Sequence, residues 1–193
     1  EAIPHMQKVA DENPNAEVLV RAIKFSSGAQ WHITQPTPVQ NFNWQDLISD
    51  GVTDLGHALK MVAEQLRIPP MTDRALPPVL VLISDGQPTD DYVSGLKELM
   101  NLPWGKKAVR IAIAIGADAE KDVLQKFIGN PEIKPLEAHN PESLVKYIKW
   151  VSTAVLKSAS SPASQTKDAQ NSSINIPIPQ APDQKSNGVN DVW

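Results

Sequence analysis

Acidic and hydroxyl side chains gather where predicted strands end and where predicted helices begin. Asp85 directly follows the apolar stretch Val79–Ser84, and Asp118 lies shortly after the apolar stretch Val109–Ile115. The other members of this group, at predicted helix starts, are Asp50, Thr53, Asp54, Asp90 and Asp91. The carboxyl ends of parallel strands share one edge of a sheet, so these side chains are expected to lie together. Carboxylate and hydroxyl oxygens in a chain without cysteine predict a site for Mg²⁺ or Ca²⁺.

Each of these residues also has a plainer explanation. Asp85 begins an Asp-Gly turn, and Thr53, Asp90 and Asp118 each stand where a helix N-cap is expected. The clustering favours a site, and the capping interpretation stays open beside it. Other chemistries lack their motif, because no Gly-x-Ser-x-Gly surrounds Ser84 and neither a Gly-x-Gly-x-x-Gly nor a P-loop pattern occurs.

Hydrophobic periodicity predicts the strands and helices that would position this group. Val79–Ser84 and Val109–Ile115 are almost wholly apolar, as expected of adjacent central strands in a parallel sheet. Further strands are predicted over residues 17–26, 30–34 and 133–138, and helices over residues 1–13 and 53–67 and after Asp90, Asp118 and Asn140. The predicted fold class is α/β, a doubly wound, mostly parallel sheet with helices on both faces.

Apolar stripes predict which side of each later helix is buried. The helix after Asp90 is expected to bury Val93, Leu96 and Met100. Asn140 followed by proline is a strong helix start, because asparagine caps well and proline suits the first turn. The helix after Asp118 is expected to bury Val123, Leu124, Phe127 and Ile128, and the last helix Leu144, Ile148, Val151 and Val155.

Length and composition fit one globular domain followed by a different kind of segment. The chain has 193 residues, of which 41% are hydrophobic and 21% charged. A net charge of −4 gives no general electrostatic case for nucleic acid or an anionic membrane, and no apolar run approaches the roughly 20 residues that span a bilayer. The lack of cysteine fits a reducing, cytoplasmic location.

The composition changes near residue 157. Residues 157–193 are rich in Ser, Asn, Gln, Asp and Pro and bury too little apolar surface to offset the entropy of ordering the backbone. An apolar exception over residues 174–179 could add to a sheet edge. The predicted division is a domain over residues 1–156 and a disordered tail over residues 157–193.

Three segments together resemble a known family. The stretch PVLVLISDGQPTDD, residues 78–91, resembles the fourth-strand motif of von Willebrand factor A (vWA) domains. Its continuation over residues 87–91 is similar to the TerY-like, tellurium-resistance branch of that family. GVTDLGHAL, residues 51–59, resembles the family's threonine loop, and AIAIGADAE, residues 112–120, resembles its fifth strand.

The resemblance implies a metal-ion-dependent adhesion site. Thr53 would bind Mg²⁺, or Ca²⁺ or Mn²⁺, through its hydroxyl, and Asp85 would bind directly or through water. The ligand-face candidates beside them are Asp54, Gln87, Thr89 and Asp90. The family's remaining ligands come from a D-x-S-x-S loop after the first strand, and this sequence has no such loop. Since the first predicted helix also lacks an N-cap, the first strand and its loop are expected to lie outside these 193 residues.

The function that follows is binding rather than catalysis. The resemblance implies a protein partner that contributes a carboxylate to the ion, in a cytoplasmic tellurite- or stress-resistance system with kinase and phosphatase partners. One alternative is a Mg²⁺-dependent hydrolase with Asp85 as nucleophile. Its D-x-D-x-T motif fails, because Gln87 stands two residues after Asp85. The other alternative is a scaffold whose metal site has been lost.

Overall fold

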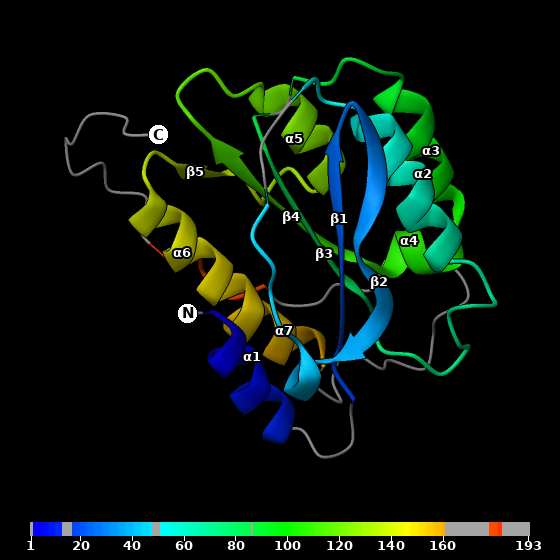
Figure 1. Cartoon of the computed structure of the whole chain (residues 1–193), viewed down its shortest axis with the longest axis vertical. Helices are drawn as coiled ribbons and strands as arrows, with labels where there is room; N and C mark the ends of the chain where they lie inside the picture. The colour runs from blue at the N-terminus through cyan, green and yellow to red at the C-terminus, as the bar shows by residue number, and fades with distance from the viewer. Residues whose placement is uncertain (1, 13–16, 48–50, 86, 161–177, 183–193) are drawn as a thin grey trace. The chain divides into compact units, whose positions relative to one another are not determined.

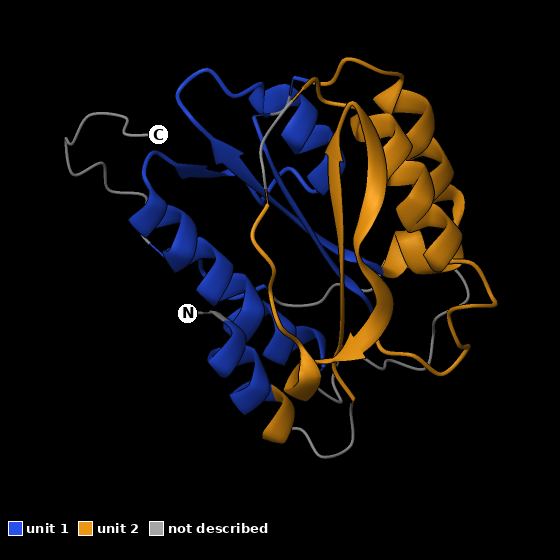
Figure 2. Ribbon diagram, in the orientation of Figure 1, with its two compact units in different colours: residues 1–9, 77–87, 108–193 blue, residues 10–76, 88–107 orange. Residues whose placement is uncertain are grey.

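The chain folds into two compact units in a computed structural model (Figures 1 and 2). The structure describes residues 2–12, 17–47, 51–85, 87–160 and 178–182. Unit 1 comprises residues 1–9, 77–87 and 108–193, and unit 2 comprises residues 10–76 and 88–107. Helix α1 (Ala2–Asp11) lies within the predicted helix over residues 1–13.

Unit 1 is built on a parallel sheet of three strands in the order β3-β4-β5. Strand β3 (Val79–Ser84) and strand β4 (Val109–Ile115) occupy the residues that their apolar composition predicts. They run in register from the Val79–Val109 pair onward. Strand β5 (Leu136–Ala138) is shorter than the predicted strand over residues 133–138. The α/β fold class and the parallel sheet are confirmed.

The expected position of β3 in that sheet is wrong. Only β4 is central, because β3 pairs with β4 on one side and forms the edge of the described three-stranded sheet. Val81 of β3 is 41% exposed, whereas Ile111 and Ile113 of β4 are at most 1% exposed. An apolar run indicates a strand suited to burial, but it does not say whether a neighbour is present on each side.

Helices cover the two faces of this sheet. On one face, Arg110 of β4 donates to the Phe127 and Ile128 carbonyls at 2.9 and 3.2 Å, at the end of α5 (Lys121–Ile128). This contact satisfies carbonyls that the helix leaves unpaired. The predicted stripe of α5 is confirmed, since Val123, Leu124, Phe127 and Ile128 are all buried.

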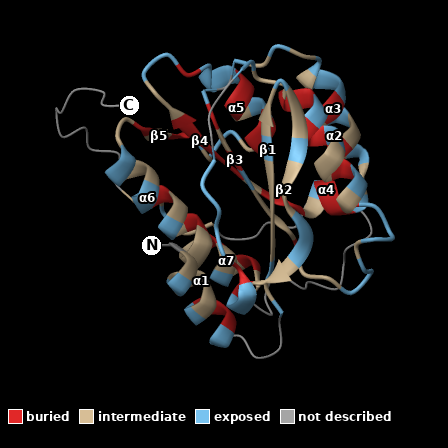
Figure 3. Cartoon of the chain, in the orientation of Figure 1, coloured by how far each residue is buried: buried red, intermediate tan, exposed pale blue. Residues whose placement is uncertain are grey.

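The other face of the sheet carries the core cluster of unit 1. This cluster is covered by a continuous helical segment made of α6 (Pro141–Trp150), the π-helical η2 (Val151–Val155) and α7 (Leu156–Ala159). Its buried residues are Val109, Ile111, Ile113, Leu136, Ala138, Tyr147, Val151, Val155 and Ala159. Figure 3 shows the same concentration of buried positions along β4.

The π-helical turn keeps the buried stripe of this segment straight. Tyr147, Val151, Val155 and Ala159 follow one another at intervals of four and are all buried. In a regular α-helix of 3.6 residues per turn, each such step rotates about 40° further around the axis. The wider π turn takes up that rotation. The predicted stripe is therefore right for Val151 and Val155 and misses Tyr147.

Helices α5 and α6 of unit 1 differ in how their N-termini are capped. Asn140 forms the predicted cap of α6, since its side chain accepts from the Ser143 amide at 2.8 Å and Ser143 bonds back to complete a capping box. Asp118 is not the cap of α5. The N-cap is Glu120, and its side chain makes no capping bond.

The segment beyond α7 is described only in part. Residues 161–177 and 183–193, which hold most of the predicted tail, lie outside the described residues. Residues 178–182 are described, and they form neither helix nor strand. Ile178 and Ala181 pack against the core cluster of unit 1.

Unit 2 contains an antiparallel hairpin. Strand β1 (Leu19–Ser26) pairs with β2 (Gly28–Pro38) around a tight turn at Gly28, whose φ of 87° suits glycine. Strand β2 is longer than the predicted partner strand over residues 30–34. It leads into the short 3₁₀ helix η1 (Val39–Asn41).

Two helices of unit 2 approach each other at glycines. Helix α2 (Leu55–Gln65) and helix α3 (Tyr92–Asn101) are followed by the short α4 (Pro103–Lys107). A Cβ atom on Gly95 would lie 2.5 Å from the Gly56 carbonyl oxygen, and one on Gly56 would lie 2.5 Å from the Asp91 carbonyl oxygen. Backbone therefore packs directly on backbone where α3 meets the start of α2.

This close approach also corrects the predicted stripe of α3. Val93 is 58% exposed, whereas Leu99 is fully buried and Gly95 is buried against α2. The helix therefore turns its glycine face inward. A stripe drawn through large apolar residues cannot detect such a face, because glycine carries no hydrophobic signal.

Adding a methyl group at this crossing tests the packing. Gly95→Ala should lower the free energy of unfolding by about 1–3 kcal/mol, because the overpacked Cβ meets backbone. This loss should appear even though alanine favours a helix by about 1 kcal/mol over glycine. The measurement is urea unfolding, with the neighbouring exposed Ser94→Ala as control, expected to change stability by less than about 0.5 kcal/mol. A Gly95→Ala protein as stable as wild type would contradict the described helix crossing.

Candidate functional site

In unit 2, the backbone of Thr53 is held by Thr89 from two sides. The Thr89 amide donates to the Thr53 carbonyl at 2.9 Å, and the Thr53 amide donates to the Thr89 hydroxyl at 3.2 Å. The Thr89 hydroxyl in turn donates to Asp54 Oδ1 at 3.0 Å. The segment around Thr53 is therefore fastened to the segment around Thr89, one of the ligand-face candidates that the family resemblance implies.

Asp54 connects the same segment to the hairpin turn. Its Oδ2 accepts from the Gly28 amide at 2.7 Å, and its own amide donates to the Ser26 carbonyl at 3.0 Å. With Oδ1 on Thr89, both carboxylate oxygens of Asp54 are engaged within unit 2. Gly28 was not among the predicted site residues. Its only sequence signal is the Ser-Gly turn, which does not reveal the distant carboxylate.

Asp90 caps a helix, but not the one that follows it in the chain. Its Oδ1 accepts from the Gly56 amide and its Oδ2 from the His57 amide, each at 2.8 Å. The expected cap of the following helix is supplied by Asp91, whose side chain accepts from Ser94. A carboxylate at a helix N-terminus satisfies unpaired amides and faces the positive end of the helix dipole. Asp90 thus stabilises the start of α2.

The Thr53 hydroxyl is left without a described partner. The Thr53 residue is half-buried, and its backbone amide and carbonyl are both engaged. Among the described residues no hydrogen bond involves its Oγ1. A hydroxyl oxygen on a fixed backbone is a preorganised ligand atom, because little conformational entropy remains to be lost on binding.

In unit 1, Asp85 stands at the carboxyl end of β3 with an exposed side chain. Its Oδ1 accepts from the Gln87 amide at 3.2 Å and from the Ser84 hydroxyl at 3.3 Å. Its carbonyl accepts from the Glu120 amide at 2.7 Å, and Gln87 Nε2 donates to the Asp118 carbonyl at 3.0 Å. The exits of β3 and β4 are therefore fastened together, with the carboxylate of Asp85 facing solvent.

The predicted metal ligands are of the type that Mg²⁺ takes, but there are too few of them to form a complete metal site. Thr53 and Asp85 supply a hydroxyl and a carboxylate, which are hard oxygen donors of the type that Mg²⁺ takes. Thr53 belongs to unit 2 and Asp85 to unit 1, and each is described within its own unit. The described residues contain no group of three or more His, Asp or Glu that could hold a metal ion. Asp50 lies outside the described residues.

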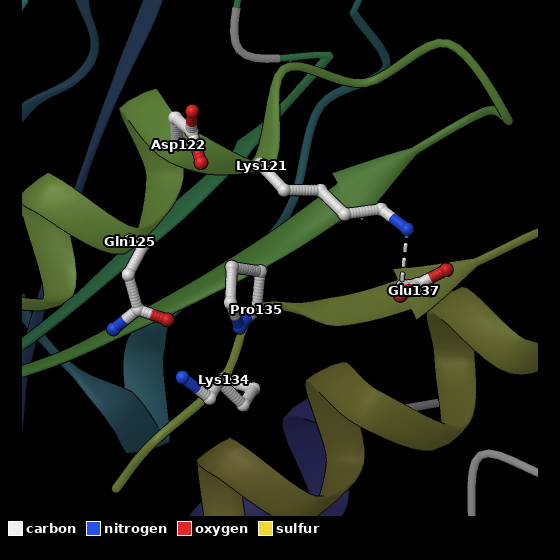
Figure 4. Close-up of a pocket in the computed structure, with 6 residues that line it drawn as sticks. All are labelled: Lys121, Asp122, Gln125, Lys134, Pro135 and Glu137. Carbon is white, nitrogen blue, oxygen red and sulfur yellow. Dashed lines mark ion pairs between the residues drawn. The ribbon is translucent and has the colours of Figure 1, made fainter. Parts of the chain in front are cut away.

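A separate pocket of about 460 Å³ lies in unit 1 (Figure 4). The Lys121 ammonium reaches the Glu137 carboxylate at 2.8 Å. Burial raises the pKa of the Tyr147 hydroxyl, and the Glu137 carboxylate adds a smaller contribution in the same direction. The residues that line the pocket are Lys121, Asp122, Gln125, Lys134, Pro135 and Glu137. With two lysines, two carboxylates and one ion pair, this pocket presents no excess of either charge.

Two further kinds of ring side chain lie outside the proposed ligand set. His57 is exposed. Among the tryptophans, Trp104 is buried, Trp31 and Trp150 are half-buried, and Trp44 is 44% exposed. Among the described helices, none has both the length and the apolar character that crossing a bilayer requires.

The family model for the von Willebrand factor type A domain matches residues 20–149. This range covers more than half of the 193 residues. The chain therefore belongs to the von Willebrand factor type A domain family, whose members typically mediate metal-dependent protein interactions. No curated protein matches the chain.

Removing the carboxylate of Asp90 tests whether it stabilises α2. Asp90→Ala should lower the free energy of unfolding by about 1–2 kcal/mol, because two helix-start amides lose their acceptor. Asp118→Ala is the matched control, since Asp118 is exposed and only its carbonyl forms a described bond. Asp118→Ala should change the free energy of unfolding by less than about 0.5 kcal/mol. If the two variants unfold at the same urea midpoint, the result would contradict the role of Asp90 as the cap of α2.

Proposed function

We propose that this chain is a metal-ion-dependent protein-binding module and not an enzyme. The single observation that carries the proposal is the state of Thr53, whose backbone is fixed by Thr89 while its hydroxyl has no described partner. Asp85, exposed at the end of β3, is the second proposed ligand, directly or through water. Family membership supports both assignments.

The proposed ion is Mg²⁺, with Ca²⁺ or Mn²⁺ as substitutes. Asp54 and Asp90 already accept hydrogen bonds from amides in unit 2, so their oxygens are less available as direct ligands for an ion. An ion held by few negative ligands keeps Lewis acidity at an open coordination position. A carboxylate from a protein partner is the ligand proposed for that position, and hard oxygen donors of this kind suit the ion.

The rest of the shell is proposed to come from an additional strand that ends in a D-x-S-x-S loop. No such loop occurs in these residues, and β3 is an edge strand of the described three-stranded sheet, with Val81 exposed. An edge strand can pair with a further strand. From the resemblance of residues 87–91, we further propose a cytoplasmic, TerY-like role in tellurite or stress resistance, with kinase and phosphatase partners.

A metal-independent scaffold is the second candidate. The observation that favours it is the commitment of Asp54 and Asp90 to structural hydrogen bonds, which would hold the loops in place without an ion. The two candidates differ in one respect that can be measured, which is whether a divalent ion binds at Thr53 and Asp85.

Calorimetric titration with Mg²⁺ separates them. The 193-residue chain should bind Mg²⁺ weakly. A chain extended by a strand ending in D-x-S-x-S should bind Mg²⁺ at least tenfold more tightly, which corresponds to about 1.4 kcal/mol in binding free energy. In the extended chain, Thr53→Ala and Asp85→Ala should each remove at least that gain. Asp122→Ala, an exposed carboxylate in the unit 1 pocket, is the control and should bind as the parent does. Equal Mg²⁺ affinity in all variants would favour the scaffold.

A further inference from the structure

The short segment of residues 178–182 returns to unit 1 after the end of α7. It is the red stretch of Figure 1, and 17 residues of sequence separate it from Ser160. Ile178 and Ala181 pack against the core cluster of unit 1. Both residues are half-buried, while Gln180 between them is exposed. The segment therefore presents one side to the cluster and the other to solvent.

The sequence of the segment fixes this geometry. Ile178 precedes Pro179 and Ala181 precedes Pro182, and a residue before proline is restricted to extended or polyproline II conformations. A polyproline II helix has three residues per turn, so residues three apart lie on the same side. Ile178 and Ala181 are three apart. The spacing of the two contacting residues thus matches a polyproline II backbone, which is one of the conformations that the following prolines allow.

The surface beneath the segment suits such a ligand. It belongs to the core cluster of unit 1, in which Tyr147 supplies an aromatic ring and against which Trp150 also packs. Aromatic surfaces are the usual partners of polyproline II segments, which lose little entropy on binding.

We propose that residues 178–182 are an intramolecular ligand of unit 1, and that the face they cover is a docking site for an extended, proline-bearing apolar segment. The resident occupant is this chain's own segment. Because a short tether gives an effective concentration on the order of millimolar, even a modest intrinsic affinity keeps the face occupied. This proposal does not depend on the metal site.

The test compares three full-length proteins with one synthetic peptide that spans residues 176–184. In Ile178→Asp, a charge on the contacting side should release the resident segment. In Gln180→Asp, the same charge on the exposed residue should leave it docked. The labelled peptide should bind Ile178→Asp at least tenfold more tightly than it binds wild type or Gln180→Asp, as measured by fluorescence anisotropy.

Hydrogen exchange supplies the second readout. Amides of residues 147–159 should exchange faster in Ile178→Asp than in Gln180→Asp, and added peptide should restore their protection. Ile178→Ala should shift both readouts in the same direction by a smaller amount, which keeps the test valid if the charged variant folds poorly. Equal peptide binding by all variants would overturn the proposal. A wild-type dimer that Ile178→Asp converts to a monomer would also overturn it, by placing the segment on a second copy.

Discussion

The contact on which unit 2 depends is the close approach of α3 to the start of α2. It is possible because Gly56 and Gly95 place backbone against backbone. The segment that precedes α3 is thereby brought to the first turn of α2, where the Asp90 carboxylate accepts from two amides. The Thr89 bonds to Thr53 and Asp54 follow from the same placement. A single packing constraint thus sets both a helix start and the backbone of the proposed ligand residue.

This arrangement divides the acidic residues by role. Asp54, Asp90 and Asp91 bond to amides or hydroxyls within unit 2 and serve the fold. Asp85 remains exposed at the end of β3. Most of the carboxylates that cluster in the sequence therefore act as hydrogen-bond acceptors that stabilise the fold. Under the proposed function, that division leaves Asp85 as the proposed carboxylate ligand from this chain, and the open position of the ion receives a carboxylate from another protein.

The parts of the fold predicted correctly are those encoded by local pattern. Val79–Ser84 and Val109–Ile115 form strands over the predicted residues, since a run of apolar residues between turns leaves few alternatives. Asn140 with the following proline marks the start of α6 for a similar reason. The motif over residues 78–91 likewise predicts the vWA family, which the family model confirms.

The parts predicted wrongly depend on distant partners. Asp90 is predicted to cap the helix that follows it. It caps α2 instead, because tertiary packing places the first turn of α2 within hydrogen-bond distance of the Asp90 carboxylate. The inward face of α3 is set by Gly95, which hydrophobic periodicity does not register. The edge position of β3 depends on which strands are present beside it. The backbone of Thr53 is connected to the Gly28 turn only indirectly, through the hydrogen bond between the Gly28 amide and Asp54. None of these contacts has a signal in the neighbouring sequence.

Paramagnetic Mn²⁺ provides a test of the proposed binding of a divalent ion by Thr53 and Asp85. Trace Mn²⁺ broadens amide signals near its binding site in a nuclear magnetic resonance spectrum, even when binding is weak. If the proposal is right, the amides of Thr53 and Gln87 will broaden first and together, and excess Mg²⁺ will restore both signals. Broadening centred on the exposed carboxylate of Asp122, with the Thr53 signal unchanged, would contradict the proposal.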